Sequence, residues 1–377
     1  MNKIKILHVI GTLKVGGAET VAMNYFRFIN RNIFNCDYLV YGDEIGEYEE
    51  EVYKLGGNVI RIPKPSDNYN EFQINCQNIF KKGGYDIVHS HTLLNNGLVM
   101  KAAKKAGVKA RICHSHNIKN RPKENLITFL YAQYMKILIR KNSTDFLACA
   151  REAGIYLFGR KKFESNGIVI KNGIETSKFL YDSNIRGKTR ENLSVENKFV
   201  VGNIGRLVDQ KNQKYLLEIF QMVLKEIPDS ILLIVGDGAL RGCLEEKSKS
   251  LGIGSAVRFL GSRDDIKDLL QAMDVFVFPS LFEGLGIVLV EAQTSGLKCI
   301  VSNTIPREAG ISNLIEFVDL NQRKEYWANL IISKKNEMER SNMEGIISKS
   351  GYDIKSVVKK LERIYIDSLG INMGDVS

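Results

Sequence analysis

Short runs of apolar residues alternate along the chain with longer stretches in which apolar positions recur every three or four residues. The short runs predict buried strands of a parallel sheet, and the longer stretches predict amphipathic helices. We expect strands in the first half at residues 4–10, 36–41, 58–62, 87–90, 110–113, 145–148 and 168–170. We expect strands in the second half at 199–204, 230–235, 257–260, 275–278 and 299–302. This alternation predicts an α/β protein with doubly wound parallel sheets.

The length of 377 residues favours two domains. Apolar periodicity is lost at 181–197, so we predict a first domain at 1–185 and a second at 195–350. A further helix is predicted at 351–370, and its apolar side needs a surface to pack on. That side carries Ile354, Val357, Val358, Leu361, Ile364 and Tyr365.

Residues 276–296 predict a buried strand, a short glycine loop and a helix. Gly284 and Gly286 allow a tight turn, which points the amides of Leu285, Gly286 and Ile287 out of a helix N-terminus. Such amides at the carboxyl end of a parallel strand favour an anion, and a diphosphate fits there.

Two glutamates, Glu283 and Glu291, flank this predicted anion site. A carboxylate repels a phosphate, so each glutamate is better suited to accept hydrogen bonds from hydroxyl groups, one on a sugar and one on a ribose. A nucleotide sugar offers hydroxyls on both sides of a diphosphate. The alternative is that both are solvated acids at the ends of a helix.

Arg206 and Lys211 follow another predicted strand of the second domain. A lysine at a helix start is unfavourable by roughly 0.3–1 kcal/mol unless an anion compensates it. The two cations therefore predict a diphosphate clamp, with Asn212 capping the next helix. An ordinary surface loop is the alternative.

In the first domain, Gly16 and Gly17 lie in a loop between a strand and a helix. They let a ligand approach the backbone, although a helix-entry turn also uses glycine. The spacing is not GxGxxG, which disfavours a nicotinamide cofactor. Two other strands end in HSHT (89–92) and HSHN (114–117). His114 or His116 could reach a substrate, whereas His89 and His91 are expected to form hydrogen bonds inside the domain.

Composition narrows the function classes further. The six cysteines are scattered without a CxxC pair, which indicates free thiols in a reducing cytoplasm. No D-x-D triplet and no His/Cys cluster with ligand spacing is present, so no bound metal is implied. No apolar run is long enough to span a membrane, and the first residues predict a strand rather than a signal peptide.

Positive charge is concentrated at 101–141, with eleven basic residues against one acid. Residues 119–141 interleave cations with aliphatic and aromatic side chains, which is typical of a helix on an anionic membrane surface. A core helix with a solvated basic face is an equal alternative. Nucleic acid is disfavoured as a partner because no nucleic-acid motif accompanies the charge.

Four motifs resemble glycosyltransferase family 4, the retaining E-x7-E group with the GT-B fold: GGAE (16–19), GRLVDQKNQ (205–213), VGDG (235–238) and FPSLFEGLGIVLVEA (278–292). The segment 283–309 is especially similar to the EpsF-like branch of bacterial exopolysaccharide and capsule biosynthesis. The resemblance is most specific between 200 and 310. Lys298 stands where many members have proline, in a turn behind the site. The resemblance implies two Rossmann-like domains facing across a cleft, the first binding the acceptor and the second the nucleotide sugar. It also implies that the helix at 351–370 returns to the first domain.

The resemblance also implies roles for individual residues. Arg206 and Lys211 would bind the donor diphosphate, Glu291 the ribose and Glu283 the donor sugar. Gly17 would approach the phosphates, and His114 would lie near the sugar. Such enzymes retain anomeric configuration and use neither a metal nor another cofactor, and the departing phosphate is often proposed as the base.

We therefore predict a hexosyltransferase-type glycosyltransferase (EC 2.4). It would move a sugar from a nucleotide-diphosphate sugar, with UDP favoured, to a lipid-linked (polyprenyl diphosphate) oligosaccharide. It would be cytoplasmic and peripheral at the inner face of the plasma membrane. The alternatives are a catalytically silent nucleotide-sugar-binding subunit and a GT-B-type nucleotide-sugar epimerase.

Overall fold

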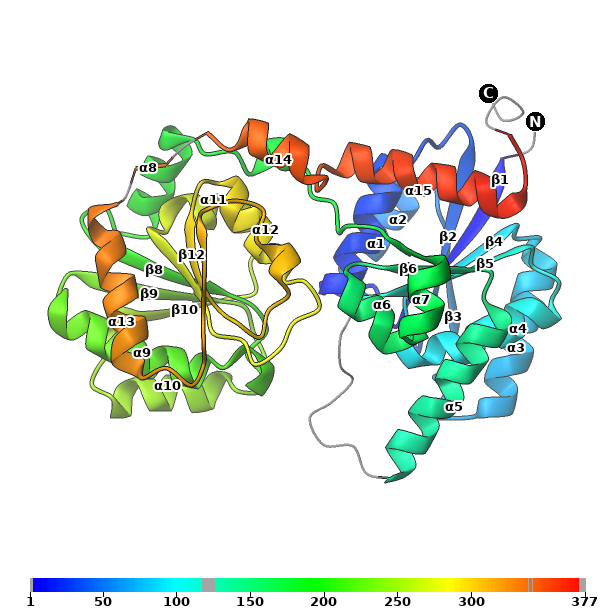
Figure 1. Ribbon diagram of the computed structural model, residues 1–377, viewed down its shortest axis with the longest axis horizontal. Helices are drawn as coiled ribbons and strands as arrows, with labels where there is room; N and C mark the ends of the chain where they lie inside the picture. The colour runs from blue at the N-terminus through cyan, green and yellow to red at the C-terminus, as the bar shows by residue number, and fades with distance from the viewer. Residues whose placement is uncertain (1–2, 117–125, 338, 341, 373–377) are drawn as a thin grey trace. The chain divides into compact units, whose positions relative to one another are not determined.

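The computed structural model describes residues 3–116, 126–337, 339–340 and 342–372. The chain forms two compact units. Unit 1 comprises Met1–Ile174 and Gly351–Ser377, and unit 2 comprises Glu175–Ser350. Each unit contains one sheet in which all paired strands are parallel (Figure 1). The predicted α/β class with parallel sheets is confirmed.

The sheet of unit 1 has seven strands in the order β3-β2-β1-β4-β5-β6-β7. They are β1 (Ile4–Val9), β2 (Phe34–Tyr41), β3 (Val59–Ile62), β4 (Ile87–Ser90), β5 (Ala110–Ser115), β6 (Asp145–Ala148) and β7 (Gly167–Val169). All of them lie where apolar runs predicted them. The order reverses between β1 and β4, so the loops that follow these two strands lie at a switch point, where open α/β sheets bind ligands.

Helices cover both faces of this sheet (Figure 1). They are α1 (Gly17–Phe28), α2 (Glu49–Lys54), α3 (Tyr69–Gly83), α4 (Asn96–Lys105), α5 (Leu126–Asn142), α6 (Arg151–Phe158), α7 (Arg160–Asn166) and α15 (Ile354–Leu369). The last helix of the chain, α15, packs against α1 and β5 within unit 1. All six positions that the sequence assigned to its apolar side are buried there.

The sheet of unit 2 has six strands in the order β10-β9-β8-β11-β12-β13. They are β8 (Phe199–Ile204), β9 (Ser230–Val235), β10 (Val257–Gly261), β11 (Val275–Phe278), β12 (Lys298–Ser302) and β13 (Ile315–Val318). The sequence missed β13. This strand lies at the sheet edge and only its last residue is buried, so it lacks the continuous apolar run of a central strand.

The helices of unit 2 are α8 (Ser183–Asn192), α9 (Gln213–Glu226), α10 (Arg241–Ser250), α11 (Ile266–Ala272), α12 (Ile287–Thr294), α13 (Lys324–Ser333) and α14 (Glu344–Ser350). The predicted domain boundary within 181–197 is wrong, because α8 occupies most of that segment and packs on α11. Most residues of α8 are polar, and two of them, Arg186 and Arg190, form ion pairs with the buried Asp274. The chain passes from unit 1 to unit 2 after Ile174, not at 185–195.

Two composition-based predictions can be compared with the structure. Across the described residues, no helix is both long enough and apolar enough to cross a bilayer. All six cysteines are free thiols, and five of them are buried, with Cys243 exposed.

Candidate functional site

In unit 2 the strand order reverses between the neighbouring strands β8 and β11. The loops that follow them, 205–212 and 279–286, therefore start at the same edge of the sheet. Both carry residues that the sequence selected as candidates. This edge is where open parallel sheets place their ligands.

Three hydrogen bonds join these two loops. The amide of Leu281 donates to the carbonyl of Gln210 at 2.8 Å, and the Gln210 side chain donates to the carbonyl of Phe282 at 2.8 Å. The Asn212 side chain donates to the carbonyl of Pro279 at 3.2 Å. The predicted helix cap by Asn212 is wrong, since this side chain joins the loops and makes no cap hydrogen bond.

Lys211 and Glu283 form an ion pair between the joined loops, with Nζ 2.7 Å from Oε1. Their side chains are only 14% and 8% exposed, which leaves little water to screen the pair. The ammonium also lies 4.6 Å from the centroid of the Phe278 ring. Gly205 makes room for the lysine stem, because a Cβ atom there would lie 3.1 Å from Lys211 Cε. The structure thus brings together two residues that the sequence assigned to one site.

The amide end predicted for this site is present at the start of α12. Gly286 precedes the helix with φ at 74°, a left-handed conformation that favours glycine. Among the described residues, the amides of Leu285 and Gly286 make no recorded hydrogen bond to another backbone group. The first turn, which begins at Ile287, carries no acid. The local field at this helix end therefore favours an anion.

Glu291 lies on α12, one turn after its start, and is partly buried. Within the described part of the chain its carboxylate has no recorded cation or hydrogen-bond donor. Burial raises its pKa to about 7, because the charged form loses water without gaining a partner. The Glu291 carboxyl group therefore changes its charge near neutral pH, and its carboxylate form can accept a hydrogen bond from a ligand.

Arg206 lies two residues after the end of β8, and it is exposed. No carboxylate among the described residues pairs with its guanidinium. Its carbonyl accepts a hydrogen bond of 3.1 Å from the Gln213 side chain, which holds the backbone while the side chain stays free. The loops of this one switch point in unit 2 therefore carry the ion-paired Lys211, the unpaired Arg206 and the amides at the start of α12.

In unit 1, Gly16 and Gly17 lie in the loop after β1, and α1 begins at Gly17. A Cβ atom at position 17 would meet no atom within 4 Å, and Gly17 does not have a positive φ. Neither the fold nor the helix entry therefore requires glycine at this position. This favours the interpretation that a ligand approaches the backbone there.

All five histidines of the chain come together in unit 1, in what we call the histidine cluster. They lie on or directly after three adjacent strands, β1, β4 and β5. Their rings form two hydrogen-bonded chains. One chain links His8 Nδ1 to His91 Nε2 at 3.1 Å and His91 Nδ1 to His116 Nε2 at 2.9 Å. The other chain links the Tyr365 hydroxyl to His89 Nδ1 at 2.7 Å and His89 Nε2 to His114 Nδ1 at 3.2 Å.

This cluster confirms that His89 and His91 form hydrogen bonds inside the domain, but it changes the interpretation of His114. His114 has no exposed surface, because it lies inside β5 with its ring stacked on those of His89 and His116. The predicted contact of His114 with a sugar does not fit this burial. His116 follows the strand and retains 9% exposure. The two H-x-H pairs were the sequence signal for the cluster, but the strand order that joins them was not evident.

The basic segment predicted at 119–141 is described from residue 126 onward, and residues 119–125 lie outside the described residues. Its helix α5 buries one narrow side, formed by Ala132, Met135, Leu138, Ile139 and Asn142. Its other side exposes large apolar residues, which we call the exposed face of α5: Leu126, Ile127, Phe129, Leu130, Tyr131, Tyr134 and Ile137. The helix therefore packs on the core of unit 1 by one side, as the core-helix alternative expects, while its other side exposes large apolar residues that this alternative does not explain.

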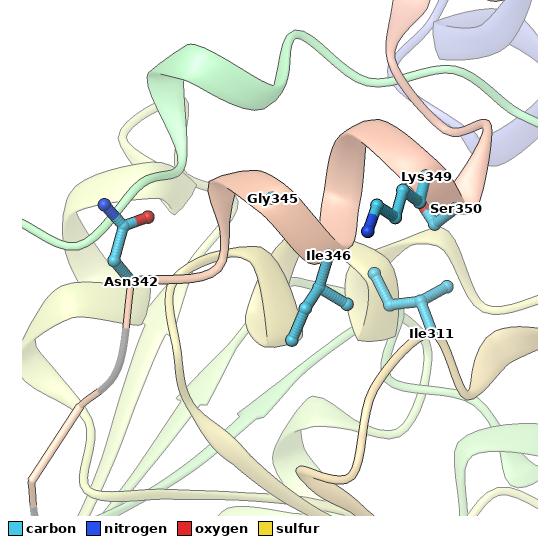
Figure 2. A pocket seen from close by; sticks show the side chains of 6 residues that line it. All are labelled: Ile311, Asn342, Gly345, Ile346, Lys349 and Ser350. Atoms are coloured by element: carbon cyan, nitrogen blue, oxygen red, sulfur yellow. The ribbon is translucent and has the colours of Figure 1, made fainter.

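A cavity of about 470 Å³ lies elsewhere in unit 2, beside α14. Ile311 and Ile346 lie close together in it, with Lys349 above them (Figure 2). None of the candidate site residues lines this cavity. Its position does not coincide with the strand-end loops, so it is not the candidate site.

Comparison with known proteins assigns both halves of the chain. Residues 185–313 match the family model "Glycosyl transferases group 1", and residues 15–178 match "Glycosyltransferase Family 4". The EpsF protein of Bacillus subtilis, which is named as a glycosyltransferase, is 32% identical over 96% of each chain. The UDP-Gal:alpha-D-GlcNAc-diphosphoundecaprenol alpha-1,3-galactosyltransferase of Escherichia coli is 28% identical over 97% of each chain.

A solved structure supports the fold. HepE of Anabaena, crystallised in complex with UDP, superposes with a TM-score of 0.79 at 21% identity, covering 96% of this chain and 100% of that one. The two parallel sheets of seven and six strands, each with its covering helices, are those of the GT-B fold.

Proposed function

The chain belongs to the glycosyltransferases of these two family models, and we propose that it transfers a sugar from a nucleotide-diphosphate sugar to a lipid-linked oligosaccharide in the synthesis of a bacterial exopolysaccharide or capsule. The observation that carries the donor part of the proposal is the Lys211–Glu283 pair between the loops of the unit 2 switch point. A held cation beside free helix-end amides suits a pyrophosphate.

The proposed roles follow from the charges. Lys211 and Arg206 neutralise the diphosphate and the charge that develops on it as the sugar leaves. Glu283, released in part from Lys211 by the phosphate, accepts hydrogen bonds from sugar hydroxyls, and Glu291 accepts them from the ribose. Cations and amides supply what a divalent metal would supply at the diphosphate, so we propose that transfer needs no metal there. Retention of the anomeric configuration is proposed from the resemblance to the retaining E-x7-E group.

The proposed choice of donor and acceptor rests on the relatives. HepE was crystallised in complex with UDP. The name of the E. coli relative gives UDP-galactose as donor and a diphosphoundecaprenol-linked sugar as acceptor. A UDP-sugar and a polyprenyl-diphosphate acceptor are therefore the first substrates to test for this chain.

The test is a thermal-shift panel of UDP-, GDP- and ADP-sugars, followed by product analysis with a polyprenyl-diphosphate-linked acceptor. One nucleotide class is expected to raise the melting temperature, and its sugar is expected to appear on the acceptor. Binding without product for any acceptor would favour a silent binding subunit. Conversion of the donor sugar without an acceptor would favour an epimerase.

The affinity for the UDP-sugar should depend on pH through Glu291. If the carboxylate form accepts ribose hydroxyls, raising the pH from 6 to 8 through a pKa of about 7 should tighten binding by up to about tenfold. The intact nucleotide sugar is the required ligand, because its bridged phosphates do not change charge in this range, unlike free UDP. Isothermal titration calorimetry at several pH values measures the effect.

The matched control is Glu291→Gln, which keeps the shape and removes the titration. It should bind the donor more weakly and with no pH dependence between 6 and 8. The stability of the wild-type protein without ligand should change with pH in the direction opposite to the affinity: its unfolding free energy should fall as the pH rises. Because the folded carboxyl holds its proton more tightly than the unfolded one, its contribution to the unfolding free energy falls as pH rises from about 4.5 to about 7. An unchanged pH profile in the variant would remove Glu291 from the site.

We further propose that the exposed face of α5 rests on the inner leaflet of the plasma membrane, where a lipid-linked acceptor is located. Leu126 and Ile127 are 72% and 78% exposed, and aromatic side chains follow them. Lys136, Arg140 and Lys141 lie on the same helix. Exposed apolar and aromatic residues with nearby cations favour an anionic bilayer surface.

Replacing Leu130 by aspartate should lower partitioning onto vesicles of anionic and zwitterionic phospholipid by about tenfold, since it removes apolar burial and adds repulsion. Ile74→Asp on α3 is the matched control, because Ile74 and Leu130 are both 57% exposed in the same unit. Vesicle sedimentation measures the bound fraction. Equal loss in both variants, or no binding by the wild type, would remove the membrane from the proposal.

A further inference from the structure

The histidine cluster has a geometry that hydrogen bonding between imidazoles does not fully explain. We propose that His91, His114 and His116 bind one divalent transition-metal ion, with zinc the ion to test first. Each residue has a ring nitrogen that lies within 4.8 Å of the corresponding nitrogens of the other two. His91 Nδ1 lies 2.9 Å from His116 Nε2. Zinc–nitrogen bonds of about 2.0–2.1 Å at a tetrahedral centre place ligand nitrogens about 3.3 Å apart. The His91 and His116 nitrogens already lie near this separation, and the group as a whole lies within 4.8 Å.

The surrounding histidines supply acceptors for the ligand imidazoles. If His91 ligates through Nδ1, its Nε2–H donates to His8 Nδ1 at 3.1 Å. If His114 ligates through Nε2, its Nδ1–H donates to His89 Nε2 at 3.2 Å, and His89 Nδ1 in turn lies 2.7 Å from the Tyr365 hydroxyl. One set of tautomers therefore gives both of these ligands an acceptor, whereas His116 Nδ1 has no hydrogen-bond partner among the described residues. Metal-bound histidines in proteins usually donate their second N–H in this way.

The nitrogen that points to an ion is His114 Nε2. It belongs to a side chain with no exposed surface, and it has no hydrogen-bond partner within the described part of the chain. A buried polar atom without a partner costs about 1–3 kcal/mol, and a metal bond would remove this cost.

A second group, His8, His89 and His91, also meets the distance requirement but suits an ion less well. Its nitrogens that face one another and their neighbours are engaged in hydrogen bonds, and its three side chains are at most 6% exposed. The proposed group includes His116, which follows β5 and is the most exposed histidine of the cluster. Among the described residues, this end of the cluster is the least enclosed. Neutral imidazoles as the only ligands select zinc and its neighbours rather than magnesium or calcium.

The experiment uses the full chain without a histidine tag. The protein is incubated with zinc chloride, separated from free ion by gel filtration, and analysed for zinc by mass spectrometry. About one zinc per chain is expected from the single proposed site. Because every histidine of the chain belongs to the cluster, no other histidine can account for binding. The control Cys243→Ser, which removes the exposed thiol, should bind zinc as the wild type does.

Two histidine variants are expected to reduce zinc binding to different extents. His116→Asn removes a ligand at the accessible end and should abolish stoichiometric binding. His89→Asn removes only an acceptor behind a ligand and should weaken binding by about 10–100-fold. Zinc-edge X-ray absorption of the wild type should show imidazole nitrogens around the ion, and this readout remains valid if a variant fails to fold. Failure of the wild type to retain zinc, binding by folded His116→Asn at wild-type strength, or a spectrum without imidazole scattering would each overturn the proposal. The nucleotide thermal shift is measured separately and is not needed for this result.

Discussion

Replacing Lys211 by methionine is expected to lower kcat/KM for sugar transfer by about 10²–10³-fold, the loss typical for one group that stabilises developing charge. In the free protein this ammonium is held by Glu283 at 2.7 Å and lies over the Phe278 ring. Methionine keeps the length of the stem and its contact with Gly205 but removes the charge. The nucleotide sugar should no longer raise the melting temperature, because its diphosphate loses the held cation.

Loss of stability could imitate this result, since Lys211→Met leaves a Glu283 side chain that is 8% exposed and has lost its cation. Removing one partner of a buried ion pair can cost several kcal/mol. The double variant Lys211→Met/Glu283→Gln removes both charges and should recover most of the melting temperature. Transfer should remain lost, which separates the role in binding from the role in folding.

The matched control is Lys247→Met. Lys247 also forms an ion pair with a glutamate of unit 2, Glu218, but on α10 and α9 away from the switch-point loops. The kcat/KM of the Lys247→Met variant should stay within about twofold of the wild-type value, as for surface substitutions away from a site. Equal activity of Lys211→Met and Lys247→Met would refute the assignment of the donor site.

The candidate site in unit 2 was predictable because each of its residues follows a strand that has a strong signal. Buried parallel strands form continuous apolar runs, and their carboxyl ends meet at one edge. The sequence therefore placed Lys211 and Glu283 at that edge, although 72 positions separate them. It did not predict their ion pair in the free protein, because that depends on three loop hydrogen bonds that have no sequence pattern.

The histidine cluster was not predicted, for a different reason. The sequence showed two H-x-H pairs, and residues two apart on a strand share a face. His8 lies far from both pairs along the chain and joins them only because β1 lies beside β4, with His8 opposite His89 in the register. Strand order is a property of the whole sheet, so a search for ligand spacing along the chain could not find this group.

The wrong domain boundary has a similar cause. Helix α8 was assigned to a linker because its residues are mostly polar, and polar segments without periodicity usually lie between domains. Its attachment to unit 2 instead uses ion pairs and hydrogen bonds. Arg186 donates to the carbonyls of Gln271 and Met273, and Arg190 donates to that of Ala272. Hydrophobic patterning does not detect a helix that is held by guanidinium groups.

The same attachment gives the second large expected effect. Asp274→Ala should lower the free energy of unfolding of unit 2 by about 3–5 kcal/mol, the cost of breaking a buried ion pair from one side. The Asp274 side chain is 1% exposed, pairs with Arg186 and Arg190, and accepts a hydrogen bond of 2.7 Å from the amide of Val200. Its loss leaves buried guanidinium groups and a strand amide without their acceptor.

Urea unfolding followed by tryptophan fluorescence can assign this loss to unit 2, because the chain has a single tryptophan, Trp327, which is fully buried in that unit. Asp229→Ala is the control, since Asp229 forms an ion pair of 2.8 Å with Lys198 but its side chain is 77% exposed. The control should unfold at the wild-type midpoint, because exposed pairs add little stability. A wild-type midpoint for Asp274→Ala would mean that α8 is held by its carbonyl contacts alone and that the buried carboxylate contributes little. A lower midpoint for Asp274→Ala alone would identify ion pairing to a buried carboxylate as the interaction that attaches this polar helix to unit 2.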